Sequence, residues 1–167
     1  LTLRVLAHLL RYPDETLRAH LPELKGALRD ERALASGRID ELDALLDRLA
    51  RSRGFDAEVE YVELFDRGRG TSLHLFEHVH GDSRDRGPAM VDLIKTFEAA
   101  GLHLAPGELP DFLPVVLEFA STQPPPQAAE FLREIAHILQ VIFSALVKRQ
   151  SPYASVLAAV LDLAGEK

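Results

Sequence analysis

The chain has 167 residues, 47% of them hydrophobic, and a formal net charge of −7, which suits one globular domain. It contains no cysteine, so disulfides, thiolate metal sites and cysteine nucleophiles are excluded. No apolar run approaches the roughly 20 residues of a membrane-spanning helix, and no secretory signal pattern is present, so we expect a cytoplasmic protein.

The acidic residues are concentrated in the middle of the chain. Residues 55–122 carry 13 acidic and 5 basic side chains, whereas residues 1–54 have a net charge of +1 and residues 123–167 a net charge of zero. Because nucleic-acid affinity depends on lysine and arginine, this balance argues against a nucleic-acid partner. The same field would attract a basic peptide, although it would equally keep a cytosolic protein in solution.

Apolar residues recur at helical spacing from the start of the chain. A first stripe occupies residues 3–10 and stops before Pro13, because the residue before a proline is pushed out of the helical conformation. Asp14 can cap a second helix, with apolar residues from 17 to 28, that Pro22 kinks or restarts. Further helical stripes lie at residues 39–49, 56–66, 73–80, 88–97, 111–121 and 127–149, with a last short helix after Pro152.

Glycine and proline separate these helices. Gly68 and Gly70 end one helix, and Thr71 or Ser72 can cap the next. Gly101 ends the helix that carries the stripe of Met90, Leu93, Ile94 and Phe97.

Two glycine- or proline-rich segments, residues 101–110 and 121–127, are a loop and a linker. We expect them to be hinges or linkers within one domain that spans residues 1–167. Residues 127–149 are apolar enough to form the central core helix. Since no alternating run of β-branched residues is present, the sequence predicts an all-α, single-domain bundle of about eight or nine helices.

Residues 74–78 spell His-Leu-Phe-Glu-His, a pattern in which two histidines one helical turn apart bind zinc. On this interpretation His74 and His78 are metal ligands, and Glu77 is the general base of a zinc-dependent hydrolase. A catalytic zinc needs a third protein ligand, which the sequence does not single out. Surface histidines without a metal explain the pattern as well, so both interpretations stay open at this point.

The glycine-containing loop of residues 68–72 precedes a helix, and its free backbone amides could hold a phosphate. No strand comes before it, and the sequence lacks a complete G-x-G-x-x-G or P-loop pattern. Helix punctuation is therefore the favoured interpretation of this loop.

A dense polar and aromatic strip runs from residue 61 to residue 85. Its aromatic side chains could anchor an amphipathic helix of a partner, and its acidic side chains could steer basic residues of that partner. The anchors would be Tyr61, Phe65 and Phe76, and the steering acids Glu63, Asp66, Glu77 and Asp82. As ordinary core and solvated surface, the same strip would need no partner.

The run of residues 61–93, YVELFDRGRGTSLHLFEHVHGDSRDRGPAMVDL, closely resembles the signature block of the NarJ family of respiratory nitrate reductase assembly chaperones. The run ELPDFLP at residues 108–114 is similar to the family's second block, and the opening LLRYP at residues 9–13 is typical of it. Gly70 and Pro88 are small departures from the pattern that we expect.

The resemblance implies a non-enzymatic, all-helical chaperone of the wider TorD-like group, with no cofactor of its own. Such a chaperone acts in nitrate assimilation. It binds the apo catalytic (alpha) subunit of nitrate reductase, at the N-terminal, leader-like segment of that subunit. It supports insertion of iron–sulfur clusters and the molybdenum cofactor before membrane docking. We expect a monomer or weak dimer that neither inserts into the membrane nor binds nucleic acid.

On this resemblance, we expect the partner peptide to contact the strip and the segment around residues 108–118. The expected peptide-binding residues are Tyr61, Glu63, Phe65, Asp66, Arg67, Phe76, Glu77, His78, Gly81, Asp82, Glu108, Pro110, Asp111 and Glu118.

Overall fold

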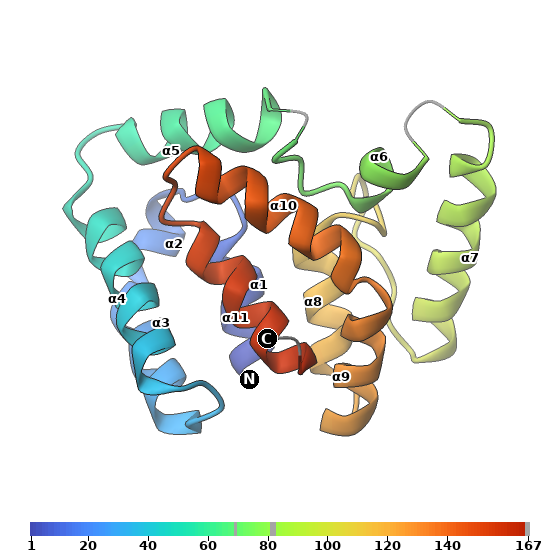
Figure 1. Ribbon diagram of the computed structural model, residues 1–167, viewed down its shortest axis with the longest axis horizontal. Helices are drawn as coiled ribbons and strands as arrows, with labels where there is room; N and C mark the ends of the chain where they lie inside the picture. Colours follow the sequence, from blue (N-terminus) through green and yellow to red (C-terminus); the bar gives the residue numbers. More distant parts are fainter. Residues whose placement is uncertain (69, 81–82, 166–167) are drawn as a thin grey trace.

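In the computed structural model, the chain folds into a bundle of helices (Figure 1). The structure describes residues 1–68, 70–80 and 83–165. The helices, in chain order, are α1 (Thr2–Leu9), α2 (Glu15–Ala19), α3 (Leu21–Glu31), α4 (Ser36–Arg51), α5 (Asp56–Tyr61), the π-helical turn η1 (Val62–Asp66), α6 (Leu75–Val79), α7 (Arg86–Ala99), α8 (Leu113–Ser121), α9 (Pro125–Glu134), α10 (Ala136–Lys148) and α11 (Ala154–Ala164). These ranges contain no strand, only an isolated bridge between His74 and Phe112. The all-α prediction is confirmed.

The core is centred on α11. The sequence predicted this helix only as a short one at the end of the chain. Eight of its 11 residues are buried, and it packs against α1, α4, α9 and α10. Its sequence, ASVLAAVLDLA, is apolar on several sides, as a helix surrounded by other helices requires.

The prediction that residues 127–149 form one central helix is wrong. The helix breaks at Ile135, where φ is −105° and ψ is 6°, and both resulting helices, α9 and α10, contact α11. A straight helix of that length would run about 35 Å, and the break lets each half turn its own apolar face to α11. The outer side of α10 stays exposed, with Val141 and Val147 half open to solvent.

The described residues form eleven α-helices and one π-helical turn, more than the expected eight or nine helices, because several expected helices are divided. Residues 14–28 form α2 and α3, with Pro22 in the first turn of α3, so the predicted restart is confirmed. The segment 56–66 likewise changes from α-helical to π-helical geometry after Tyr61. No helix in the described ranges is both long and apolar enough to cross a membrane.

α7 lies at the edge of the bundle (Figure 1). Of its predicted apolar stripe, only Phe97 is buried, and its ring stacks on that of Phe119 with centroids 4.6 Å apart. The helix gives way to Gly101, whose φ of +84° is a conformation that favours glycine, as expected.

Candidate functional site

The first part of the predicted strip belongs to one continuous helix, α5 followed by η1. The Arg67 amide donates to the Val62 carbonyl five residues earlier, at 3.2 Å, which defines the π-helical turn. Such turns are rare, and they are frequent at functional sites. The turn is therefore a local sign that this part of the strip is specialised.

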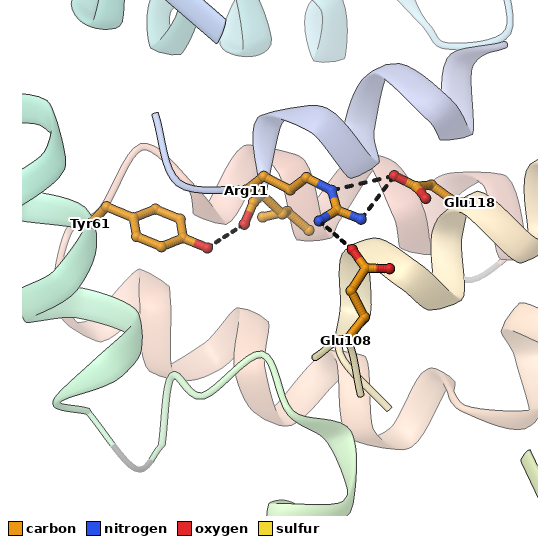
Figure 2. A network of polar contacts seen from close by, with 5 residues as sticks. Arg11, Tyr61, Glu108 and Glu118 are labelled. Carbon is orange, nitrogen blue, oxygen red and sulfur yellow. Dashed lines mark hydrogen bonds and ion pairs between the residues drawn. The ribbon is translucent and has the colours of Figure 1, made fainter. Parts of the chain in front are cut away.

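Tyr61 and Phe65 point into the core from this helix. Their exposed fractions are 4% and 5%, and the Tyr61 hydroxyl donates a hydrogen bond to the Leu10 carbonyl at 2.6 Å (Figure 2). Burial raises the pKa of Tyr61, so its hydroxyl stays a donor. Neither ring is exposed in this arrangement, so the expectation that they act as apolar anchors for a partner stays a prediction. An apolar stripe on a helix marks the face that packs against the core. These two rings therefore hold the α5–η1 helix in place beneath its exposed face.

The two rings belong to an aromatic cluster. Phe65 lies 4.8 Å from Tyr61 and 5.1 Å from Tyr153, measured between ring centroids, and Tyr12 meets Tyr61 edge-on at 5.9 Å. The cluster joins the end of α1, the α5–η1 helix and the start of α11. It fixes η1 relative to the core.

α6 is held by a residue far away in the chain. The buried carboxylate of Asp111 accepts a hydrogen bond from the Phe76 amide at 3.0 Å, and the Asp111 carbonyl accepts one from the Leu75 amide at 3.0 Å. Asp111 therefore caps the first turn of α6, whereas the prediction that Thr71 or Ser72 caps it is wrong. The structure thus brings together two predicted site residues, Phe76 and Asp111.

His74 sits beside the same carboxylate. Its Nδ1 atom is 3.8 Å from an Asp111 carboxylate oxygen, and its ring stacks on Phe112 with centroids 5.0 Å apart. Asp111 raises the pKa of His74 above its usual value of 6.5, although partial burial of the ring opposes this. His74 is therefore a titratable link between α6 and the segment before α8.

Two other predicted site residues, Glu108 and Glu118, converge on Arg11. The Arg11 guanidinium donates to a carboxylate oxygen of Glu108 at 3.0 Å and to one of Glu118 at 3.0 and 3.3 Å (Figure 2). It also lies 6.0 Å from the centre of the Phe112 ring. These carboxylates already have an internal cation, so they steer an incoming basic residue less strongly than the sequence suggested.

Arg11 itself was missed as a site residue. Its two partners lie 97 and 107 residues away, so no local periodicity reveals the contact. The one indication in the sequence is its place in the LLRYP opening that is typical of the family.

The remaining predicted residues divide into exposed and internal ones. Glu63, Asp66, Arg67 and Glu77 are exposed, and Glu63 pairs with Arg67 at 3.0 Å. Phe76 is half-buried, and Pro110 is buried. The predicted residues Gly81 and Asp82 lie outside the described residues.

The zinc interpretation gains no support from the arrangement of the histidines. The His78 Nε2 atom lies 2.8 Å from the Ser72 carbonyl oxygen, and His74 faces Asp111. Within the described ranges, no three histidine, aspartate or glutamate side chains gather as ligands for a metal ion. A zinc site built on Glu77 and the two histidines therefore lacks a visible third ligand.

Comparison with known proteins gives consistent matches along the chain. A family model described as the nitrate reductase delta subunit matches residues 13–159. The nitrate reductase molybdenum cofactor assembly chaperone NarJ of Escherichia coli (strain K12) is 44% identical over 160 residues, which are 96% of this chain and 68% of that protein. The probable chaperone NarW of the same strain is 45% identical over 98% of this chain and 68% of its own length. The probable chaperone NarJ of Bacillus subtilis (strain 168) is 32% identical over 96% of this chain and 86% of its own length.

Proposed function

Because the chain belongs to the nitrate reductase delta subunit family, and its relatives from Escherichia coli are named as assembly chaperones rather than as catalytic enzymes, we propose that it binds the apo catalytic subunit of a respiratory nitrate reductase. The observation that carries this proposal is the 44% identity, over 96% of the chain, with a protein named as a molybdenum cofactor assembly chaperone. The chaperone recognises the N-terminal, leader-like segment of that subunit. It keeps the subunit competent for insertion of iron–sulfur clusters and the molybdenum cofactor before membrane docking.

The proposed contact surface consists of the exposed residues of η1 and α6. Glu63, Asp66 and Glu77 are solvent-accessible carboxylates, and such groups attract basic residues of a partner from a distance. Half-buried Phe76 lies between them in the chain and adds apolar area. Asp82 is included in the proposal on the strength of the sequence.

The buried side chains beneath this surface have a supporting role in the proposal. The aromatic cluster fixes η1, and Asp111 fixes the start of α6. A partner that docks on a preorganised surface loses less conformational entropy on binding. One copy of the chain, as a monomer, would be enough for the proposed contact.

The proposal is tested by co-expressing the chain with the nitrate reductase catalytic subunit from the same organism. Two hosts are compared, one that makes the molybdenum cofactor and one that cannot make it. A one-to-one complex should be recovered with the cofactor-free subunit from the second host. The complex should be lost once the subunit carries the cofactor. Recovery of no complex with either form would overturn the chaperone assignment.

A charge-neutralised variant tests the contact surface. The double variant Asp66→Asn, Glu77→Gln should bind the leader-like segment with a slower association rate and a shallower dependence on salt. The matched control, Glu130→Gln, Glu134→Gln, removes the same charge from exposed positions on α9 and should leave the rate unchanged. Equal association rates for the two variants would contradict steering by η1 and α6.

A further inference from the structure

α7 is attached to the bundle by very little of its surface (Figure 1). Only one of its 14 residues is buried, whereas eight of the 11 residues of α11 are. It does not pack along the length of any other helix that the structure describes. Within the described ranges, the one side-chain hydrogen bond of α7 is internal to the helix, where the Thr96 hydroxyl donates to the Asp92 carbonyl at 3.1 Å. The contacts that fix α7 to the bundle are therefore few and apolar.

The C-terminal end of α7 carries this attachment. The ring of Phe97 is fully buried against that of Phe119, which in turn meets the ring of Phe131 edge-on with centroids 5.2 Å apart. Just after the helix, the Leu102 amide donates to the Phe97 carbonyl at 2.9 Å, and Leu102 packs against the core. Such a bond closes a helix and fixes the direction of the chain that follows it. Phe97 and the turn behind it therefore fasten α7 to α8.

The rest of α7 has no comparable attachment. Its apolar stripe continues through Met90, Leu93 and Ile94, but all three side chains are only half-buried. Of these three, Leu93 alone packs against the core. The side chain of Asp85, which precedes the first turn, does not cap the helix. The first two-thirds of α7 therefore depend on the contact that Phe97 makes near its end.

A helix of this length and composition is not stable by itself. Isolated helices shorter than roughly 12–15 residues are marginal in water, and most helices in proteins are stabilised by packing of their apolar face. α7 also contains Gly87 and the β-branched residues Val91, Ile94 and Thr96, which lower its helix propensity further. Because α7 needs its contact with α8 to remain helical, detachment from the bundle and unfolding of α7 are one event.

We propose that α7 is a lid that detaches and unfolds as a separate unit while the helices around α11 stay folded. Phe97 is its fastener, and detachment uncovers the ring of Phe119 on α8. Segments with few buried apolar contacts open at a lower free energy than the core, and the moving elements of proteins are drawn from such segments. The inference goes beyond the proposed function and does not rest on it, because it concerns the chain alone.

Amide hydrogen exchange of the wild-type chain, measured at several low concentrations of urea, tests the lid. The amides of α7 should be protected at least ~100-fold less than those of α11. Their exchange rate should hardly depend on urea, because opening of α7 exposes little surface, whereas exchange in α11 requires global unfolding and accelerates steeply with urea. Equal protection and equal urea dependence in the two helices would show one cooperative unit and would overturn the proposal.

Two proline variants at exposed positions within helices form a matched pair. Asp92→Pro changes α7 and Ser144→Pro changes α10, and proline breaks either helix. Asp92→Pro should abolish protection in α7, and protection in α11 should fall by no more than the factor by which wild-type α7 is itself protected. Ser144→Pro should lower protection in α11 by ~100-fold or more, because α10 packs on α11. An Asp92→Pro chain that does not fold, or that loses more protection in α11 than this factor, would overturn the proposal.

Phe97→Ala tests the fastener, and Val91→Ala is its control on the same helix, since the Val91 side chain is exposed. In Phe97→Ala the amides of α7 should exchange within ~10-fold of the rate of an unstructured peptide, while those of α11 stay protected. Val91→Ala should not reduce protection in α7, because it removes no buried contact and alanine favours the helix. Equal protection of α7 in the two variants would overturn the assignment of Phe97 as the fastener.

Discussion

The carboxylate of Asp111 accepts a hydrogen bond from the backbone amide of Phe76, 35 residues earlier in the chain, at 3.0 Å. It thereby caps a helix, α6, that has no side-chain cap of its own at His74. The cap ties the strip of η1 and α6 to the segment that leads into α8. Two stretches that resemble different sequence blocks of the family thus meet at one buried carboxylate.

Removing this cap should cost more stability than removing an ordinary one. Asp111→Ala leaves the Phe76 amide unpaired at a half-buried position, and we expect a loss of about 2–3 kcal/mol. The matched control is Asp14→Ala, which removes the exposed cap that accepts from the Leu17 amide at 2.8 Å on α2, with an expected loss of about 1 kcal/mol or less. Urea unfolding measures both losses. An equal loss in the two variants would contradict the special role of Asp111.

The ion pair between His74 and Asp111 should make stability depend on pH. Because the pKa of His74 is raised on folding, its contribution is complete below pH 6.5 and is lost as the pH rises through the folded-state pKa. The wild-type chain should therefore exceed His74→Gln in stability by more at pH 5.5 than at pH 8.5. The difference should stay below about 1 kcal/mol, since solvent screens the partly exposed ring. It should become smaller in an Asp111→Asn background, where Glu77 alone still raises the pKa of His74, and an opposite pH trend in urea unfolding would contradict the assignment.

Gly68 is required because no side chain fits there. A Cβ atom at this position would lie 2.8 Å from the Leu64 carbonyl oxygen and 3.0 Å from a guanidinium nitrogen of Arg149. We expect Gly68→Ala to destabilise the chain by about 1–3 kcal/mol. In Gly70→Ala the added Cβ would make only an ordinary contact, 3.6 Å from Ala145, and stability should change by less than about 0.5 kcal/mol. Equal thermal unfolding midpoints for the two variants would refute this packing argument.

Arg11 should contribute more to the stability of the folded chain than an exposed cation does. Arg11→Met leaves the carboxylates of Glu108 and Glu118 without their shared cation in a half-buried site, and we expect a loss of about 1–3 kcal/mol. Lys25→Met breaks an exposed ion pair with Asp47 and should cost about 0.5 kcal/mol or less. Chemical denaturation of both variants gives the comparison, and a loss for Arg11→Met no larger than that of the control would contradict the network's importance.

The sequence predicted the helices well where short-range chemistry decides them. The restart at Pro22 and the helix end before Gly101 follow from local backbone preferences, and both are confirmed. The break at Ile135 has no such local cause. It depends on two helices packing on α11, and a single sequence does not show which helices become neighbours.

The candidate site was predictable as a region and not as a set of roles. The polar and aromatic strip does include the exposed acids of η1 and α6, yet the same helical spacing placed Tyr61 and Phe65 in the core. Arg11 escaped because its importance comes from Glu108 and Glu118, partners 97 and 107 residues away that only the folded chain brings close. Periodicity finds the face of a helix, whereas long-range contacts decide what that face does.

The most direct test of the chaperone assignment is a calorimetric titration of the wild-type chain with the N-terminal peptide of its nitrate reductase catalytic subunit, at low and at high salt. Binding should be saturable and one-to-one, and it should weaken as salt increases, since an acidic surface meets a basic segment. Absence of binding to the peptide and to the whole apo subunit, in either salt, would contradict it.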